Sequence, residues 1–192
     1  MTLKASTMLP LRTPLPHFEL PEVRTHHLIS PEFFTGKPAI LVMFICRHCP
    51  YVVHVQEDLP KLGREYQGKH VGIVAISSND VKQYPQDSPA RLKEMAEELQ
   101  FPFPYCYDET QKVAKAFTAA CTPDFFLFNK ERKLVYRGQF DDSRPGNGKP
   151  VTGRDLRMAL DAVLDGKPIP VVQQPSAGCN IKWKAGNEPD YW

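Results

Sequence analysis

A continuous apolar run, Ala39 to Ile45, ends directly at two cysteines three positions apart, Cys46 and Cys49. An uninterrupted run of this length is typical of a strand buried on both faces of a sheet. Pro50 follows the second cysteine, and proline is favoured at the first position of a helix. The segment therefore predicts a strand-to-helix junction that carries a pair of thiols.

The position of these thiols favours redox or thiol-transfer chemistry. Backbone N–H groups and the helix dipole at a helix start favour a thiolate over a thiol, which makes a cysteine there a better nucleophile at neutral pH. Cys-x-x-Cys is also a spacing of metal ligands, so a zinc half-site is an alternative. No second Cys-x-x-Cys completes such a site in this sequence, and we expect no metal.

The rest of the composition narrows the class of protein. The 192 residues are 42% hydrophobic, which is enough for one domain over residues 1–192. The net charge of +2 comes without a basic stripe, so we expect no nucleic-acid partner. No apolar run is long enough to span a bilayer and residues 1–16 lack the apolar stretch of a secretory signal, so we expect a cytoplasmic protein without membrane contact.

Residue patterns along the chain predict alternating strands and helices. The expected elements are a strand at 39–45, a helix from 50 to about 66 kinked at Pro60, a strand at 71–76, helices near 88–99 and 108–117, a hairpin of 125–128 with 134–137, and a last helix from about 152 to 165. This order predicts an α/β fold with a central mixed sheet and helices on both faces. An N-terminal extension and a C-terminal tail, 167–192, flank it.

Cys121, Thr122 and Pro123 stand just before the apolar strand at 125–128. Together with the cysteine pair and the order of elements, this motif resembles the thioredoxin superfamily. The segment Pro-His-Phe-Glu-Leu at 16–20 is similar to the alkyl hydroperoxide reductase/thiol-specific antioxidant (AhpC/TSA) branch. The resemblance covers about residues 11–166 and implies a thioredoxin-like fold. It also implies a cis Thr122–Pro123 bond whose neighbouring backbone pairs with a bound substrate.

The resemblance also assigns roles to the two cysteines. Counting from Phe44, the position of the superfamily's nucleophile is Cys49, and the usual resolving position holds Val52. We therefore expect Cys49 to attack a disulfide and Cys46 to resolve the mixed disulfide. The reverse assignment, in which Cys46 attacks and Cys49 resolves, is the alternative.

Peroxiredoxins of this branch carry a proline, a threonine and an arginine around their cysteine. The corresponding positions here hold Val42, Cys46 and Pro123, so strong peroxidase activity is not expected. A thiol–disulfide oxidoreductase is the favoured function, because disulfide exchange needs none of those three residues. The alternatives are a peroxiredoxin-like antioxidant that forms a sulfenic acid at Cys49 and a non-catalytic binding module of thioredoxin fold.

Several further residues are candidates near the thiols. Arg47 and His48 are expected to tune a thiolate, together with Pro50. Cys121 and Cys179 are candidate additional redox thiols, whereas Cys106 in an apolar run is read as core.

The expected partners are small molecules and redox proteins. The substrate is a protein or small-molecule disulfide, or a peroxide, and a dithiol reductant completes the cycle. No organic cofactor is expected, because no Gly-rich dinucleotide motif follows a strand. The protein is expected to be a monomer or a homodimer.

The C-terminal tail is too apolar for a disordered end. It carries Ile181, Trp183, Tyr191 and Trp192 around an isolated cysteine, Cys179. We expect the tail to pack on the domain near the cysteine helix and to bring Cys179 within disulfide reach of Cys49 or Cys121.

Overall fold

The apolar runs of the sequence form a mixed five-stranded sheet. The computed structural model describes residues 2–191, and its central sheet has the strand order β6-β5-β4-β8-β9. The strands are β4 (Ala39–Phe44), β5 (Gly72–Ser77), β6 (Tyr105–Tyr107), β8 (Asp124–Asn129) and β9 (Leu134–Gly138). β4, β5 and β6 run parallel, whereas β8 and β9 are antiparallel to their neighbours. The predicted mixed sheet is therefore confirmed.

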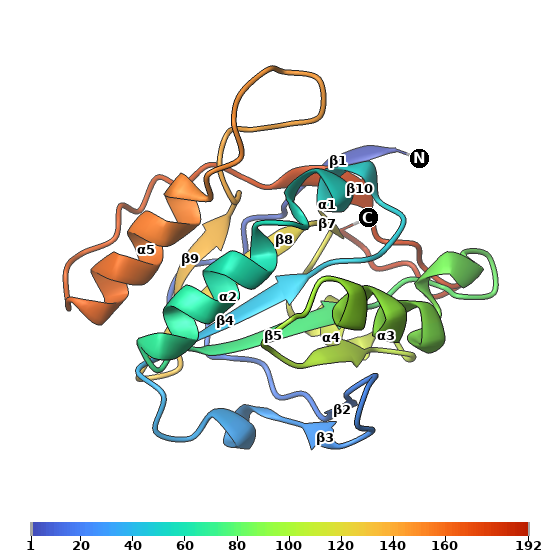
Figure 1. Cartoon of the computed structure of the whole chain (residues 1–192), viewed down its shortest axis with the longest axis horizontal. Helices are drawn as coiled ribbons and strands as arrows, with labels where there is room; N and C mark the ends of the chain where they lie inside the picture. Colours follow the sequence, from blue (N-terminus) through green and yellow to red (C-terminus); the bar gives the residue numbers. More distant parts are fainter. Residues whose placement is uncertain (1, 192) are drawn as a thin grey trace.

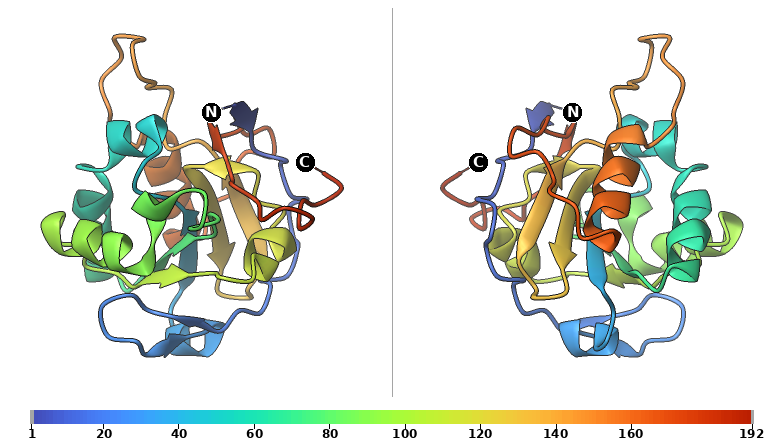
Figure 2. Two further views of the ribbon diagram at one scale, coloured as in Figure 1. Left: turned by 90° about the vertical axis from the view of Figure 1, so that its right-hand side faces the viewer. Right: turned by 90° about the vertical axis from the view of Figure 1, so that its left-hand side faces the viewer.

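Helices cover both faces of this sheet (Figure 2). Alternate residues of β4 point to opposite faces, so Leu41 and Met43 belong to one apolar cluster and Val42 to the other. The first cluster includes side chains of α2 (Leu59–Gly68), α3 (Pro89–Glu98) and α5 (Arg154–Leu164). The second includes α4 (Lys112–Ala116), the N-terminal segment and part of the tail.

The helix after the thiol pair is broken rather than kinked. α1 (Pro50–Val55) ends before a turn, and α2 starts at Leu59 with Pro60 in its first turn. The expected continuous helix over 50–66 is therefore wrong. Proline lacks an N–H and its ring clashes with the carbonyl four residues earlier, whereas the first turn of a new helix accommodates it.

Two small sheets complete the fold. One joins β1 (Leu3–Ala5), β10 (Ala177–Asn180) and β7 (Cys121–Thr122) in the order β1-β10-β7. The other pairs β2 (Leu20–Pro21) with β3 (Leu28–Ile29), and two 3₁₀ turns span Pro31–Phe34 and Pro85–Asp87.

The first small sheet brings both ends of the chain to the thiol junction. Strand β10, drawn in red, runs beside the blue β1 and close to α1 (Figure 1). The sequence pattern of the tail does not predict β10, because the partners of β10 lie far away in the sequence. Trp192 lies outside the described residues. Within residues 2–191, none of the helices combines the length and the hydrophobicity needed to cross a bilayer.

Candidate active site: three thiols at a cis-proline turn

Cys49 lies where the expected nucleophile should lie, at the residue that caps α1. The Thr122–Pro123 bond opposite it is cis, as the resemblance implies. The Cys49 Sγ atom is 3.1 Å from the Thr122 carbonyl oxygen, and the Cys49 side chain is fully buried. The strand-to-helix junction and the cis-proline turn therefore meet at this sulfur.

The hydrogen bonds around Cys49 favour its thiolate. Contacts with Cys179 and Cys46 are the strongest causes that lower the pKa of Cys49, and Thr122 and the Val52 N–H contribute further. Burial acts in the opposite direction. A thiol at Cys49 donates to the Thr122 carbonyl, and this contact alone opposes ionisation, but the several donors outweigh it.

Cys46 occupies a different environment beside the same sulfur. Its Sγ atom lies 3.4 Å from Thr122 Oγ1 and 3.9 Å from His48 Nδ1. Burial is the largest cause that raises the pKa of Cys46, and its hydrogen bond to Cys49 and the charge of Asp87 add to the effect. The two pKa shifts run in opposite directions, which favours Cys49 over Cys46 as the thiolate of the pair.

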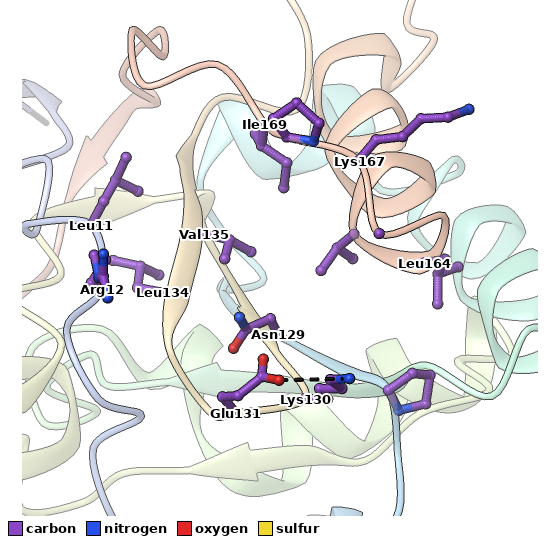
Figure 3. A pocket seen from close by; sticks show the side chains of 14 residues that line it. Leu11, Arg12, Asn129, Lys130, Glu131, Leu134, Val135, Leu164, Lys167 and Ile169 are labelled. Carbon is purple, nitrogen blue, oxygen red and sulfur yellow. Dashed lines mark ion pairs between the residues drawn. The ribbon is translucent and has the colours of Figure 1, made fainter.

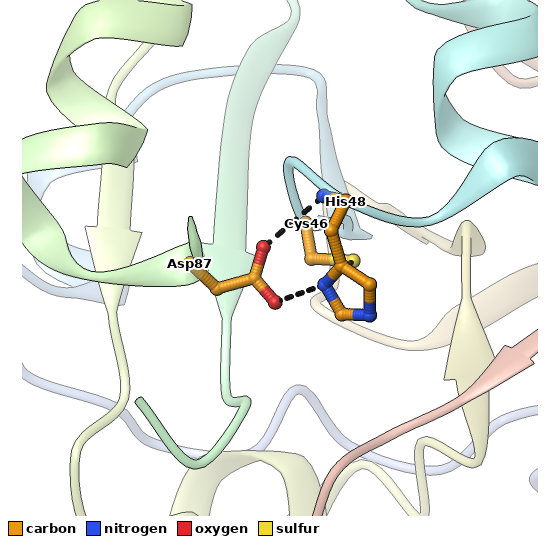
Figure 4. A group of neighbouring side chains, drawn as sticks. All are labelled: Cys46, His48 and Asp87. Carbon is orange, nitrogen blue, oxygen red and sulfur yellow. Dashed lines mark hydrogen bonds and ion pairs between the residues drawn. The ribbon is translucent and has the colours of Figure 1, made fainter. Parts of the chain in front are cut away.

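A buried carboxylate organises the loop between the two cysteines. Oδ1 of Asp87 accepts hydrogen bonds from the backbone N–H groups of Arg47 at 2.9 Å and His48 at 3.2 Å. Oδ2 lies 2.5 Å from His48 Nδ1 and accepts from Asn79 Nδ2 at 2.7 Å. Figure 4 shows the side chains of Cys46, His48 and Asp87 gathered at one place, with the carboxylate facing the imidazole. Asp87 thus holds the His48 ring beside a thiol.

The two side chains expected to tune the thiols point in different directions. His48 lies against Cys46 and stacks on Tyr84, with ring centroids 5.2 Å apart. Contrary to the expectation of a charge beside the thiols, the Arg47 guanidinium binds the Arg91 carbonyl oxygen and pairs with Glu94 and Glu98 of α3. Arg47 reaches the site through its backbone N–H, which binds Asp87.

The structure separates the remaining cysteines. Cys179 of β10 is in register with Thr122 and makes a side-chain hydrogen bond with Cys49, so it joins the thiol pair. Cys121 lies in β7, and its Sγ atom is 3.7 Å from the Pro123 carbonyl oxygen. Burial, followed by the charge of Asp124, raises the pKa of Cys121. Cys106 is buried in β6, as expected of a core residue.

Sequence reasoning missed Asp87 and Asn79. Asp87 carries an available signal, because it directly precedes Ser88 and Pro89 at a helix start. A carboxylate there is, however, also common in turns. Asn79 links two parts of the site, since Nδ2 binds Asp87 and Oδ1 accepts from the Lys182 N–H of the tail.

Cys46, His48 and Asp87 are the residues that could hold a metal, because their donor atoms lie within 4.8 Å of one another. Sulfur, imidazole and carboxylate are all zinc ligands. Both Asp87 oxygens, however, are engaged in hydrogen bonds with Arg47, His48 and Asn79. These bonds account for the arrangement without an ion, and the absence of a metal stays a prediction.

A hollow lies away from the thiols, between the β8–β9 hairpin and the end of α5. It encloses about 470 Å³, and Asn129, Leu134, Leu164 and Ile169 are among the side chains around it (Figure 3). None of its lining residues is a cysteine.

The sheet order and the cis-proline turn define a thioredoxin-like α/β protein. Residues 11–137 match the AhpC/TSA family, and the chain belongs to this family. This membership supports a thiol-based oxidoreductase function in general terms.

Solved structures agree with the assignment. The crystal structure of an uncharacterized conserved protein from Geobacillus kaustophilus is 54% identical, with 96% of this chain and 97% of that chain covered and a TM-score of 0.94. A hypothetical protein from Sinorhizobium meliloti 1021 is 49% identical, with 95% and 99% covered and a TM-score of 0.93. A putative thioredoxin from Neisseria meningitidis, 22% identical with 79% and 89% covered and a TM-score of 0.61, shares the fold. A comparison with curated proteins gave no match.

Proposed function

We propose that this protein is a thiol–disulfide oxidoreductase in which Cys49 is the nucleophile and Cys46 is the resolving thiol. The observation that carries the proposal is geometric: Cys49 caps α1 and its Sγ lies 3.1 Å from the carbonyl oxygen of Thr122 at the cis-proline turn, with Cys46 in hydrogen-bonding contact. The direction of the pKa shifts, lowered at Cys49 and raised at Cys46, agrees with it. A thiolate beside a protonated partner is the reduced state that disulfide exchange requires.

The reaction then runs in two exchange steps. The Cys49 thiolate attacks one sulfur of a substrate disulfide, the substrate S–S bond breaks, and the other sulfur leaves as a thiolate. Cys46 next loses its proton and attacks Cys49, which releases the second substrate thiol and leaves a Cys46–Cys49 disulfide. A dithiol reductant restores both thiols, and a cytoplasmic setting would supply one.

The pair formed by His48 and Asp87 orients the resolving thiol. His48 Nδ1 lies 3.9 Å from Cys46 Sγ and 2.5 Å from Asp87 Oδ2. The nitrogen that faces Cys46 is therefore the one that donates to the carboxylate, so it is not free to accept the proton of Cys46. We assign His48 and Asp87 a positioning role, and the proton of Cys46 passes to the substrate thiolate that leaves.

Membership of the AhpC/TSA family favours a second candidate, a peroxiredoxin-like antioxidant. In that reaction the Cys49 thiolate attacks a peroxide, an alcohol or water leaves, and a thiol resolves the sulfenic acid with loss of water. Pro123 stands at the position expected of the activating arginine, which weighs against this candidate.

Two assays on the purified protein test the proposal. With dithiothreitol as donor, we expect wild type and Cys106→Ser to reduce a chromogenic disulfide and Cys49→Ser to lose this activity. Full activity in Cys49→Ser would contradict the assignment. Faster consumption of hydrogen peroxide than of disulfide would favour the antioxidant. A protein inactive in both assays would be a binding module.

A further inference from the structure

The thiol pair is buried beside the C-terminal tail. Cys46 and Cys49 are both 0% exposed, whereas Cys179 is 4% exposed. Strand β10 pairs with β7, and Cys179 is in hydrogen-bonding contact with Cys49. Because Cys49 is fully buried, an external disulfide reaches it directly only after a local opening of the structure.

The tail fits the cis-proline turn closely. β10 pairs antiparallel with β7, which places Cys179 opposite Thr122. A Cβ atom at Gly178 would lie 2.0 Å from the Thr122 carbonyl oxygen and 3.3 Å from Pro123 Cδ. Only glycine allows the two backbones to approach this closely. β10 therefore occupies the position that the thioredoxin-like resemblance gives to a substrate strand.

Contacts beyond Cys179 hold the tail in this place. Ile181 is 1% exposed in the core, and its N–H donates to the Ala120 carbonyl oxygen. The Asn180 N–H donates to the Thr2 carbonyl oxygen, and the Lys182 N–H donates to Asn79 Oδ1. Because Asn79 also binds Asp87, the tail is connected to the loop that carries Cys46.

A hollow gives access to Cys179. It encloses about 230 Å³ and is lined by Thr2, Leu3, Pro50, Tyr51 and Cys179. This volume lies below the range of roughly 300–1,000 Å³ that is usual for drug-sized ligands. It admits the disulfide end of a low-molecular-weight compound such as oxidised glutathione, the rest of which stays outside the hollow, whereas a protein strand would compete with β10 for Thr122.

We propose that Cys179 is a third catalytic thiol and that low-molecular-weight disulfides enter the exchange at Cys179, not at Cys49. This inference rests on the proposed function of Cys49 and Cys46, and it adds the substrate class and the point of entry. The tail is then a built-in relay between the buried pair and the hollow.

The relay begins with a proton shift and an attack from the hollow. The hydrogen bond to Cys49 raises the pKa of Cys179, so Cys179 is the donor of this bond at rest. As the Cys179 sulfur attacks one sulfur of the external disulfide, its proton passes to Cys49, which acts as the base. The external S–S bond breaks, and the leaving thiolate takes the proton from Cys49. Cys179 now carries a mixed disulfide, and Cys49 is again a thiolate.

Two internal exchanges complete the relay. The Cys49 thiolate attacks the Cys179 sulfur, which releases the second external thiolate and forms a Cys49–Cys179 disulfide. Cys46 then loses its proton and attacks Cys49, and Cys179 leaves and regains a proton. In sum, one external disulfide is reduced to two thiols while Cys46 and Cys49 are oxidised to one disulfide.

Trapping of each intermediate tests the relay. Reduced full-length protein is mixed with oxidised glutathione without oxygen, quenched with an alkylating agent and mapped by mass spectrometry. We expect a glutathione adduct at Cys179 in Cys49→Ser and a Cys49–Cys179 disulfide in Cys46→Ser. In Cys179→Ser the Cys46–Cys49 disulfide should form at least about tenfold more slowly, because the reaction must wait for β10 to open. Cys106→Ser is the matched control with the wild-type rate.

A second variant leaves every thiol in place. Gly178→Ala forces β10 away from Thr122, so in the Cys46→Ser background the Cys49–Cys179 disulfide should be lost. The relay would be overturned by a wild-type rate of oxidation in folded Cys179→Ser. It would also be overturned by a glutathione adduct of Cys49→Ser at a cysteine other than Cys179. Should Cys179→Ser fail to fold, the site of the adduct in Cys49→Ser decides by itself, and an adduct at a cysteine other than Cys179 overturns the relay. Failure of the proposed function would look different from failure of the relay. In that case Cys49→Ser would keep the full disulfide-reducing activity of wild type.

Discussion

Cys49 and Cys106 are both fully buried, yet their surroundings have opposite effects. Cys106 lies in β6, and burial is the largest cause that raises its pKa. Cys49 lies among hydrogen-bond donors at the start of α1, and these lower its pKa in spite of burial. The comparison shows that burial alone makes a thiol inert, whereas burial among donors prepares a thiolate.

Cys121 shows that proximity to the site is not sufficient. It lies two residues before Pro123, yet its sulfur faces a carbonyl oxygen at 3.7 Å. An acceptor and the nearby charge of Asp124 favour its thiol form, in addition to burial. The type of group around each sulfur therefore decides which cysteine reacts.

The largest expected effect is on the ionisation of Cys49. At pH 6 a free cysteine is roughly 300-fold less ionised than a full thiolate, given its ordinary pKa of about 8.5. We expect wild type and Cys106→Ser to keep thiolate absorbance at 240 nm down to this pH and Cys49→Ser to lose it. Equal absorbance in all three proteins at pH 6 would contradict the proposed difference in ionisation between Cys49 and Cys106.

The next effect concerns the anchors of β10. Ile181 is buried, whereas Val172 in the same tail is 81% exposed. Ile181→Ala should lower the free energy of unfolding by about 3 kcal/mol. Val172→Ala should change it by less than about 0.5 kcal/mol. Urea unfolding measures both, and similar values for the two variants would mean that the tail is not packed as described.

Asp87→Asn tests whether the buried carboxylate organises the thiol loop. The amide of asparagine keeps one acceptor oxygen but places its N–H₂ group against an N–H donor that now binds the carboxylate. We therefore expect the free energy of unfolding to fall by about 2 kcal/mol. Because the charge of Asp87 raises the pKa of Cys46, that pKa should also fall in the variant. An NMR titration of Cys46 that shows no change would contradict this role.

The effect that is smallest per unit of pH is a pH dependence from Asp124, the neighbour of the cis-proline turn. Burial raises the pKa of Asp124 to about 7, above its ordinary value of 3.8. The folded state therefore keeps this proton over a range in which the unfolded state has lost it. Its contribution to stability is full below about pH 4 and falls as pH rises toward 7, by at most about 1.4 kcal/mol per pH unit.

Asp124→Asn removes this titration. The unfolding free energy of the variant should vary less between pH 4 and 7 than that of wild type, as measured by urea unfolding at several pH values. An unchanged slope would assign the pH dependence to other groups. Glu131→Gln, on an exposed turn, is the matched control.

Local sequence patterns predicted the elements that form close to one another in the chain. The apolar run of β4, the proline at the start of α1 and the β8–β9 hairpin were all expected. The predicted single helix over 50–66 was wrong, because Pro60 starts a new helix. Local patterns could not predict the pairing of β10 with β7 or the hydrogen bond of Asp87 to the thiol loop. In both cases the partners lie tens of residues apart in the sequence.

The sequence by itself determined the family resemblance, the thiol pair at a strand-to-helix junction and the apolar character of the tail. The tertiary structure alone decided that Asp87 holds His48 beside Cys46 and that Gly178 lets β10 pack against Thr122. It also placed Cys179 in hydrogen-bonding contact with Cys49, whereas a disulfide between Cys179 and Cys49 or Cys121 stays a prediction. The physical reason is that periodicity and capping are local properties, whereas the ionisation of a buried thiol depends on which distant donors folding brings to it.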